Sequence, residues 1–210
     1  MGQKTHPVGF RLSVTRKWLS VWFSDKDYRK NLLQDAGIRK FVRERAQAAG
    51  IHRAIIERSL SKIKVTLIVA RPGVIIGRGG SNLQILRDDL RRLTGSPVDL
   101  VIEDFKTPEL SAQLVAEDVV RQIKQRLPVR RIMSATTERV YGRGVKGVKI
   151  ICSGVLSGPS SISRSEKKVL GSIPAQTLRA NIDFARATVF TTYGTIGVKV
   201  WIYLGEVEKS

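Results

Sequence analysis

Hydrophobic and polar residues alternate along most of this chain with spacings that predict helices and strands in turn. Apolar residues at helical spacing predict a helix over about 27–50, which ends at Gly50. Two strands are expected next, over 51–58 and 63–69, and in the second Ile63, Val65 and Leu67 alternate with Lys64 and Thr66. The first part of the chain therefore predicts a mixed α and β domain.

After residue 70 the pattern changes to a short apolar stretch, a glycine-rich turn and an amphipathic helix. Residues 74–76 lead into Gly77-Arg78-Gly79-Gly80. The next helix has one face that we expect to be buried, formed by Leu83, Leu86, Leu90 and Leu93. A third strand is predicted over 98–102. This order of elements resembles a type II KH domain, which we assign to residues 26–107.

The second half predicts an α+β domain over 108–210, after a linker without periodicity at 103–109. Two helices separated by Pro128 are expected, and their apolar faces are Ala112, Val115, Val119, Ile123 and Leu127, then Ile132, Met133, Thr136 and Val140. Strand patterns lie at 148–152, 180–192 and 198–203, whereas the serine- and glycine-rich stretch 154–171 predicts a surface loop. Two helices followed by strands favour helices packed on an antiparallel sheet.

The first 25 residues have little periodicity and are rich in glycine, proline and cations. This composition predicts an extended basic arm that orders on RNA. Trp18 and Trp22 could stack on bases, but aromatic residues at this spacing more often anchor an arm to its own domain. His6 has no evident base or metal partner, so we expect a solvated or RNA-facing side chain.

The charge of the chain favours nucleic acid as its partner. There are 37 Lys and Arg against 18 Asp and Glu, a net charge of +19, and both halves share the excess. A basic membrane-surface protein is the competing interpretation. No apolar run approaches the roughly 18 residues of a spanning helix, and no signal-peptide core follows Met1. The single cysteine, Cys152, lies in an apolar strand pattern, where we expect packing rather than reactivity.

The glycine-rich turn has the chemistry of a phosphate-backbone contact. Gly77, Gly79 and Gly80 leave the main chain uncovered beside a helix start, and Arg78 supplies a cation at the tip. A KH loop of this kind clamps about four nucleotides. A P-loop is excluded because the Lys-Ser/Thr pair is missing, and the match to a dinucleotide fingerprint at 142–147 precedes a strand instead of a helix.

Cations are densest between residues 121 and 149, where nine of them accompany a single acid, Glu138. They are Arg121, Lys124, Arg126, Arg130, Arg131, Arg139, Arg143, Lys146 and Lys149. We expect this segment to form a surface that faces RNA.

Four sequence blocks resemble the bacterial-type family of ribosomal small-subunit protein three. They are MGQKTHPVGFRL at 1–12, RPGVIIGRGG at 71–80, LRANID at 178–183 and TTYGTIGVKVWI at 191–202. The resemblance covers essentially the whole chain. It implies a cytoplasmic, ribosome-bound protein without cofactor, metal or catalytic residues, or an organelle-encoded equivalent.

The resemblance also implies partners and sites. The chain would bind small-subunit rRNA in the head, beside the tenth and fourteenth small-subunit proteins. With the fourth and fifth it would line the tunnel through which mRNA enters, where Arg130 and Arg131 would help to unwind structured message. Further cations expected to face rRNA are Lys4, Arg11, Arg71, Arg126, Arg143, Lys146, Arg164 and Arg179.

Two positions depart from the family pattern. Ser134 stands where a lysine is usual, and Val155 stands where an arginine is usual. One cation of the mRNA-facing helix and one loop cation are therefore missing, and the loop 157–171 could contact its neighbours differently.

Two alternatives of other classes remain at this point. A free-standing KH regulator would lack the ribosome as a partner. An RNA-processing enzyme would need metal ligands such as Asp88-Asp89 or Glu103-Asp104, but adjacent carboxylates do not point the same way on a helix or strand.

Overall fold

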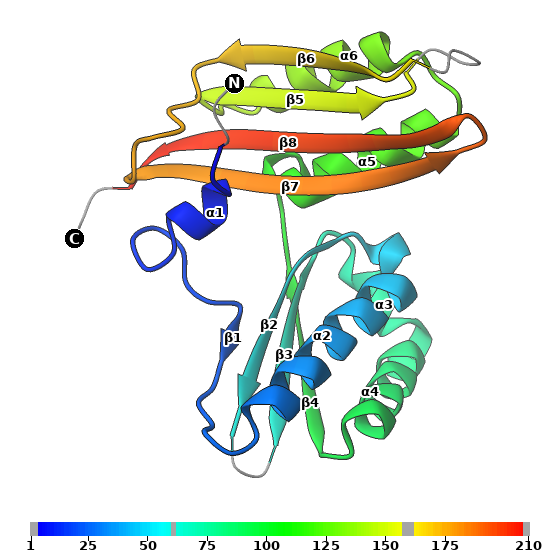
Figure 1. The fold of residues 1–210 in the computed structure, drawn as a ribbon. Helices are drawn as coiled ribbons and strands as arrows, with labels where there is room; N and C mark the ends of the chain where they lie inside the picture. Colours follow the sequence, from blue (N-terminus) through cyan, green and yellow to red (C-terminus); the bar gives the residue numbers. More distant parts are fainter. Residues whose placement is uncertain (1–3, 60–61, 157–161, 208–210) are drawn as a thin grey trace. The chain divides into compact units, whose positions relative to one another are not determined.

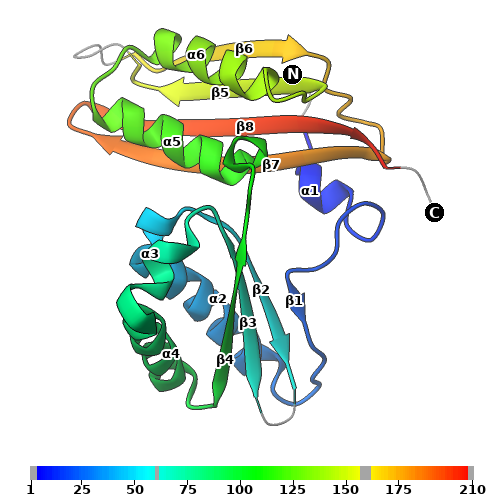
Figure 2. The ribbon, with the colours of Figure 1, turned by 180° about the vertical axis from the view of Figure 1, so that it is seen from behind.

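The chain forms two compact units (Figures 1 and 2). A computed structural model describes residues 4–59, 62–156 and 162–207. The central unit comprises residues 18–106, and the terminal unit comprises residues 1–17 together with 107–210. The sequence instead suggested divisions after residues 25 and 107. Within the described residues no helix is both long and apolar enough to cross a bilayer.

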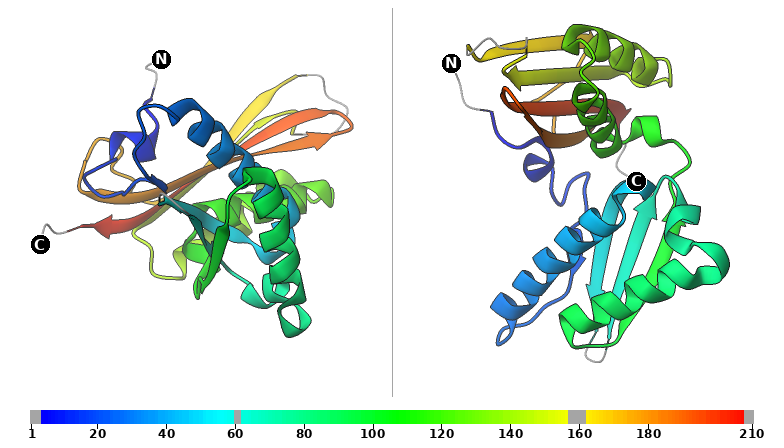
Figure 3. Two further views of the ribbon diagram at one scale, coloured as in Figure 1. Left: turned by 90° about the horizontal axis from the view of Figure 1, so that it is seen from below. Right: turned by 90° about the vertical axis from the view of Figure 1, so that its right-hand side faces the viewer.

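The central unit is a four-stranded mixed sheet with helices on one face (Figure 3). Its elements are β1 (Ser20–Val21), α2 (Tyr28–Arg45), η1 (Gln47–Ala49), β2 (Ile51–Arg58), β3 (Ile63–Val69), α3 (Pro72–Ile76), η2 (Arg78–Gly80), α4 (Ser81–Thr94) and β4 (Val98–Asp104). The strand order is β1-β2-β3-β4, with β1–β2 and β3–β4 parallel and β2–β3 antiparallel. From α2 onward the element order is the predicted one, so the type II KH arrangement is confirmed.

The core of the central unit lies between the sheet and the helices. Ile38 and Val42 of α2, Leu86 and Leu90 of α4 and Ile75 of α3 are buried against it. The sequence prediction was wrong for Leu93, which is 52% exposed. At this end of α4 the buried position is Thr94, one turn after Leu90, and its hydroxyl donates to the Leu90 carbonyl at 2.9 Å.

A buried carboxylate joins the first residues of the central unit to its sheet. Asp35 of α2 accepts hydrogen bonds from Ser20 Oγ (2.7 Å), Trp22 Nε1 (2.8 Å) and both Nε and an Nη of Arg58 (2.9 and 2.6 Å). Trp22 also contacts the ring of Tyr28. Trp22 is therefore an anchor within its own unit, as expected, whereas Trp18 is 66% exposed.

The terminal unit is an antiparallel sheet covered on one face by two helices. Its elements are α1 (Pro7–Phe10), η3 (Pro108–Leu110), α5 (Ala112–Lys124), α6 (Val129–Tyr141), β5 (Gly147–Gly154), β6 (Arg164–Gly171), β7 (Ala180–Thr191) and β8 (Gly194–Glu206). The strand order is β6-β5-β8-β7, and every neighbouring pair is antiparallel. Figure 2 shows α5 and α6 on the near face. The α+β prediction is confirmed for this half as well.

Two details of the second half differ from the prediction. Leu127 lies beyond the end of α5 and is 46% exposed, because the helix stops at Lys124. The expected loop 154–171 contains β6, and only 157–161 lie outside the described residues. Strand β6 was missed because charged residues stand on both of its faces, so no apolar alternation marks it.

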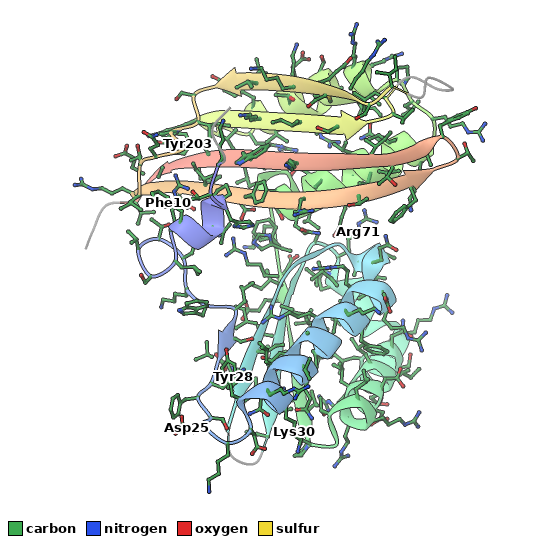
Figure 4. All side chains as sticks on the ribbon, viewed as in Figure 1. Phe10, Asp25, Tyr28, Lys30, Arg71 and Tyr203 are labelled. Carbon is green, nitrogen blue, oxygen red and sulfur yellow. The ribbon has the colours of Figure 1, made fainter. Side chains whose placement is uncertain are left out.

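The beginning of the chain packs on the terminal unit and is not an extended arm where the structure describes it. The Arg11 side chain is buried and donates to the carbonyl oxygens of Pro7, Pro174, Ala175 and Thr177 at 2.9–3.2 Å. Figure 4 shows Phe10 on this segment.

Two further contacts fix the same segment. The His6 ring meets Phe184 of β7 edge-on at 4.9 Å. Arg16 pairs with Asp183 at 3.0 Å, and the other oxygen of Asp183 accepts from the Ala112 amide at the start of α5 (2.8 Å). A carboxylate at a helix N-terminus is favourable, so Asp183 stabilises both the helix and the N-terminal segment.

Candidate nucleic-acid interface

The Gly-X-X-Gly turn is held by its neighbours while its tip stays open. Ile75 is buried and fixes the entering helix α3, and the Asn82 side chain donates to the Val74 carbonyl (3.3 Å) across the turn. Gly77 has φ +69°, and a Cβ there would lie 2.7 Å from the Asn82 side chain. A side chain at Gly77 would therefore force this support apart.

At Gly79 and Gly80 the reason for glycine is different. Both have positive φ (+61° and +81°), but a Cβ at either would meet nothing within 4 Å. The strain of a left-handed conformation, rather than crowding, favours glycine here. The open space beside the main chain is what a sugar-phosphate backbone needs for a close approach.

The start of α4 is an uncapped helix N-terminus. Gly80 is the N-cap residue and provides no side-chain hydrogen bond, and the first turn contains no acidic residue. Among the described residues no side chain accepts from the first amides of α4, and the helix dipole adds positive potential where Arg78 is exposed. This combination suits a phosphate oxygen.

A second positive site lies at the start of α6. Pro128 is its N-cap, and Arg130 and Arg131 occupy the second and third helical positions without any acid in the first turn. The charges of Arg130 and Arg131 add to the positive end of the helix dipole and raise the local positive potential. Cations are electrostatically unfavourable at this end of a helix. Arg130 Nε donates to Glu166 Oε1 of β6 (2.8 Å) yet remains 85% exposed. For Arg131 no ion pair occurs within the described ranges.

The dense cluster between 121 and 149 is less positive in space than in sequence. Asp118 binds both Arg121 and Arg139, and Glu109 binds Arg143 at 3.0 Å. Burial favours a higher pKa for Asp118, but hydrogen bonds and charges from the two arginines outweigh it and hold that pKa below its ordinary value. The neutralising acids lie outside the counted segment, so sequence counting missed them.

The remaining cations predicted to face rRNA differ in their surroundings. Exposed side chains that leave room for RNA belong to Lys4, Arg71, Arg126, Arg143, Lys146, Arg164 and Arg179. Figure 4 shows Arg71, which precedes α3. The exception is Arg11, whose guanidinium is buried among carbonyl oxygens, so its prediction as an rRNA-facing residue is corrected.

Cys152 is a packing residue. It is fully buried in β5, and burial, followed by repulsion from Glu166, raises the pKa of its thiol to about 12. A thiol with so high a pKa supplies no nucleophile near neutral pH.

The two departures from the family pattern occupy defined positions. Ser134 is half-buried on α6, one turn after Arg130. Val155 follows β5, and its side chain lies close to Gly194 at the turn between β7 and β8.

Comparison with known proteins decides the family. A model described as the ribosomal protein S3 C-terminal domain matches residues 119–202, and a KH domain model matches residues 37–110. A Caldanaerobacter subterraneus relative named small ribosomal subunit protein uS3 is 48% identical over 208 residues, 99% of this chain and 94% of the relative. This chain belongs to the uS3 family. Proteins with the same name from Carboxydothermus hydrogenoformans and Desulfitobacterium hafniense are 45% and 47% identical over 99% of the chain, covering 93% and 94% of each relative.

Membership of the uS3 family resolves the alternatives left by the sequence. A free-standing KH regulator does not account for the match over 119–202. The uS3 family is structural and not enzymatic. Of the carboxylates considered as metal ligands, Asp89 is engaged by Arg45 and Arg92 instead.

Proposed function

We propose that this uS3 protein binds small-subunit rRNA as a structural part of the ribosome and acts on mRNA through α6. The near full-length match to small ribosomal subunit proteins supports the ribosomal role. The open main chain at Gly79 and Gly80, beside the uncapped start of α4, supports RNA contact by the KH unit.

The partners of this proposal are small-subunit rRNA, mRNA and neighbouring small-subunit proteins. The tenth and fourteenth would adjoin it in the head, and the fourth and fifth would adjoin it at the tunnel where mRNA enters. Sedimentation of tagged protein through a gradient at raised salt tests the assignment. A multi-contact rRNA protein should remain with the small subunit, whereas a protein held by a few phosphate contacts washes off. Loss into the free fraction would contradict the proposal.

One observation carries the mRNA proposal. Arg130 and Arg131 are consecutive residues in the first turn of α6, where the helix dipole disfavours cations. Most of the Arg130 side chain is solvent-exposed despite its bond to Glu166. Two arginines held on a rigid helix end can engage the phosphates of one strand of a duplex and favour its separation from the other.

The test replaces Arg130 and Arg131 with alanine in ribosomes that translate messages with and without a stable hairpin. We expect slower elongation through the hairpin, an unchanged rate on the unstructured message and normal subunit assembly. The matched control is Arg87→Ala with Arg91→Ala, two exposed arginines of α4 whose loss changes the charge equally. Equal hairpin delays in the two double variants would overturn the proposal.

A further inference from the structure

One face of the terminal unit's sheet is left uncovered by α5 and α6, and Figure 1 views the sheet from this side. We call it the open face. Strand register fixes its residues, because neighbouring side chains along a strand point to opposite sides. Val148, Ile150 and Cys152 of β5 point into the core, so Lys149, Ile151 and Ser153 point to the open face.

A row of cations crosses the open face. Lys167 of β6 pairs with Ile151 of β5, Ile151 pairs with Lys199 of β8, and Lys199 pairs with Arg186 of β7. Neighbouring strands lie about 4.8 Å apart, so the backbone positions that carry the three cations span roughly 14 Å across the sheet. All three side chains are exposed, and none forms an ion pair in the part of the chain that the structure describes.

A row of small side chains lies next to the cations. Ser165, Ser153, Gly197 and Thr188 are aligned across the four strands, and the two serine hydroxyls lie 2.9 Å apart. A Cβ at Gly197 would come no nearer than 3.8 Å to another atom, so packing does not demand glycine there. The low relief of this row leaves space beside the cations for a ribose-phosphate chain.

Aromatic side chains lie on the side of the cation row opposite to the small residues. Lys149 Nζ lies 5.2 Å from the centre of the Trp201 ring, and Trp201 contacts Phe184, against which His6 packs. Burial, then repulsion by Lys4 and Lys167, lowers the pKa of Lys149. The described part of the N-terminal segment therefore packs at the aromatic end of the open face, where His6 contacts Phe184.

Acidic residues of the four strands lie away from these rows. Glu166 binds Arg130 of α6, Asp183 binds the start of α5, and Glu206 is at the end of β8. A line of unpaired cations beside hydroxyls, without a carboxylate in either row, complements a regularly spaced polyanion.

We propose that the open face is an RNA-binding surface separate from the Gly-X-X-Gly loop and from the α6 arginines. Lys167, Lys199 and Arg186 contact phosphates of one strand, which lies over the row of small residues without base-specific readout. The inference rests on the proposed function only in taking RNA as the polyanion.

The experiment measures binding of the full chain to a fluorescent uridine oligomer of about twenty nucleotides over a range of KCl concentrations. The test variant combines Lys167→Gln, Arg186→Gln and Lys199→Gln. Each lost contact lowers the slope of log K against log salt by about 0.7 for a single strand, so the slope should fall by about 2. The matched control, with the same charge change on exposed positions of α2, combines Arg29→Gln, Lys30→Gln and Lys40→Gln. Its slope should change by less than about 0.7.

The outcomes separate this inference from the proposed function. Equal slope changes in both triple variants would overturn the open-face assignment without affecting the proposed function. Polyglutamate of the same charge that competes for the chain as well as unlabelled uridine oligomer does would have the same meaning. Absence of salt-dependent RNA binding in the unmodified chain would count against the proposed function itself. Circular dichroism of both variants verifies that the fold is retained. Photo-crosslinking of the oligomer should also label peptides of β7 and β8, and labelling confined to the central unit would contradict the inference.

Discussion

Replacing Asp35 with alanine should destabilise the central unit by several kcal/mol. The Asp35 and Arg58 side chains are only 4% and 10% exposed, so removing the carboxylate leaves a buried guanidinium without its counter-charge. Breaking such a pair costs about 3–5 kcal/mol. The hydroxyl of Ser20 and the indole of Trp22 lose their acceptor in the same step.

Amide hydrogen exchange on the full chain measures this loss where it occurs. At about 1.4 kcal/mol per tenfold change, protection of α2 and β2 peptides should fall by a factor of roughly one hundred to a few thousand. Peptides of β5 and β8 belong to the other unit and serve as the internal reference. Asp25→Ala removes the same charge from an exposed position and should change protection less than about threefold.

A paired substitution separates charge from hydrogen bonding. Asp35→Leu combined with Arg58→Met replaces both ions by apolar groups and should recover the part of the loss due to the unpaired guanidinium. Ser20 and Trp22 would still lack an acceptor, so a deficit of about 2 kcal/mol should remain. A fall in α2 protection below tenfold in Asp35→Ala would refute the reasoning, because it would mean that Arg58 is adequately solvated without its partner.

Four further outcomes are expected. Changing Gly79 and Gly80 to aspartate should abolish RNA protection at the loop by adding negative charge, at a cost of about 1–2 kcal/mol of left-handed strain per residue although space is available, and unchanged footprints would count against a working loop. Ser134→Lys should shorten the hairpin delay in the translation assay, because it adds a cation one turn from the α6 arginines. An unchanged delay would mean that residue 134 does not contact mRNA. Arg11→Met should lower hydrogen-exchange protection of β7 by the equivalent of about 1–3 kcal/mol, because part-buried hydrogen bonds lose their charged donor, whereas a neutral effect would show that water replaces it. Cys152 should resist iodoacetamide at pH 8 until the protein unfolds. Folding raises the pKa of its thiol from 9.0 to about 12, so between these pH values the thiol ionises only in the unfolded chain, and the free energy of unfolding should fall as the pH rises.

Local patterns were sufficient to predict most of the fold. Strands 51–58 and 63–69 appear with the predicted bounds as β2 and β3, although of β2 only Ile56 is buried, whereas β3 buries most of its residues. Strand β6 could not be predicted, since charged side chains on both faces hide its period. Leu93 shows another limit: helical spacing places a residue on a face, but the buried area ends where the neighbouring elements end.

The candidate site was predicted less completely than the fold. The Gly-X-X-Gly loop is contiguous in sequence, so its open main chain could be inferred directly. The pairing of Asp118 with Arg139 and of Glu166 with Arg130 depends on tertiary structure, and no sequence spacing indicates it. Arg11 was interpreted from its charge alone, whereas all its partners except Pro7 lie more than 160 residues further along the chain.

That separation has a consequence for synthesis on the ribosome. Residues 18–106 contain all the strands and helices of their own unit and can fold as soon as they emerge. Apart from the nearby Pro7 carbonyl, the Arg11 and Arg16 side chains bond to residues 174–183, so the beginning of the chain must wait until most of the chain has been translated. The first segment made is thus among the last to settle, and a nascent chain that stalls before β7 would present these arginines unpaired to surrounding RNA.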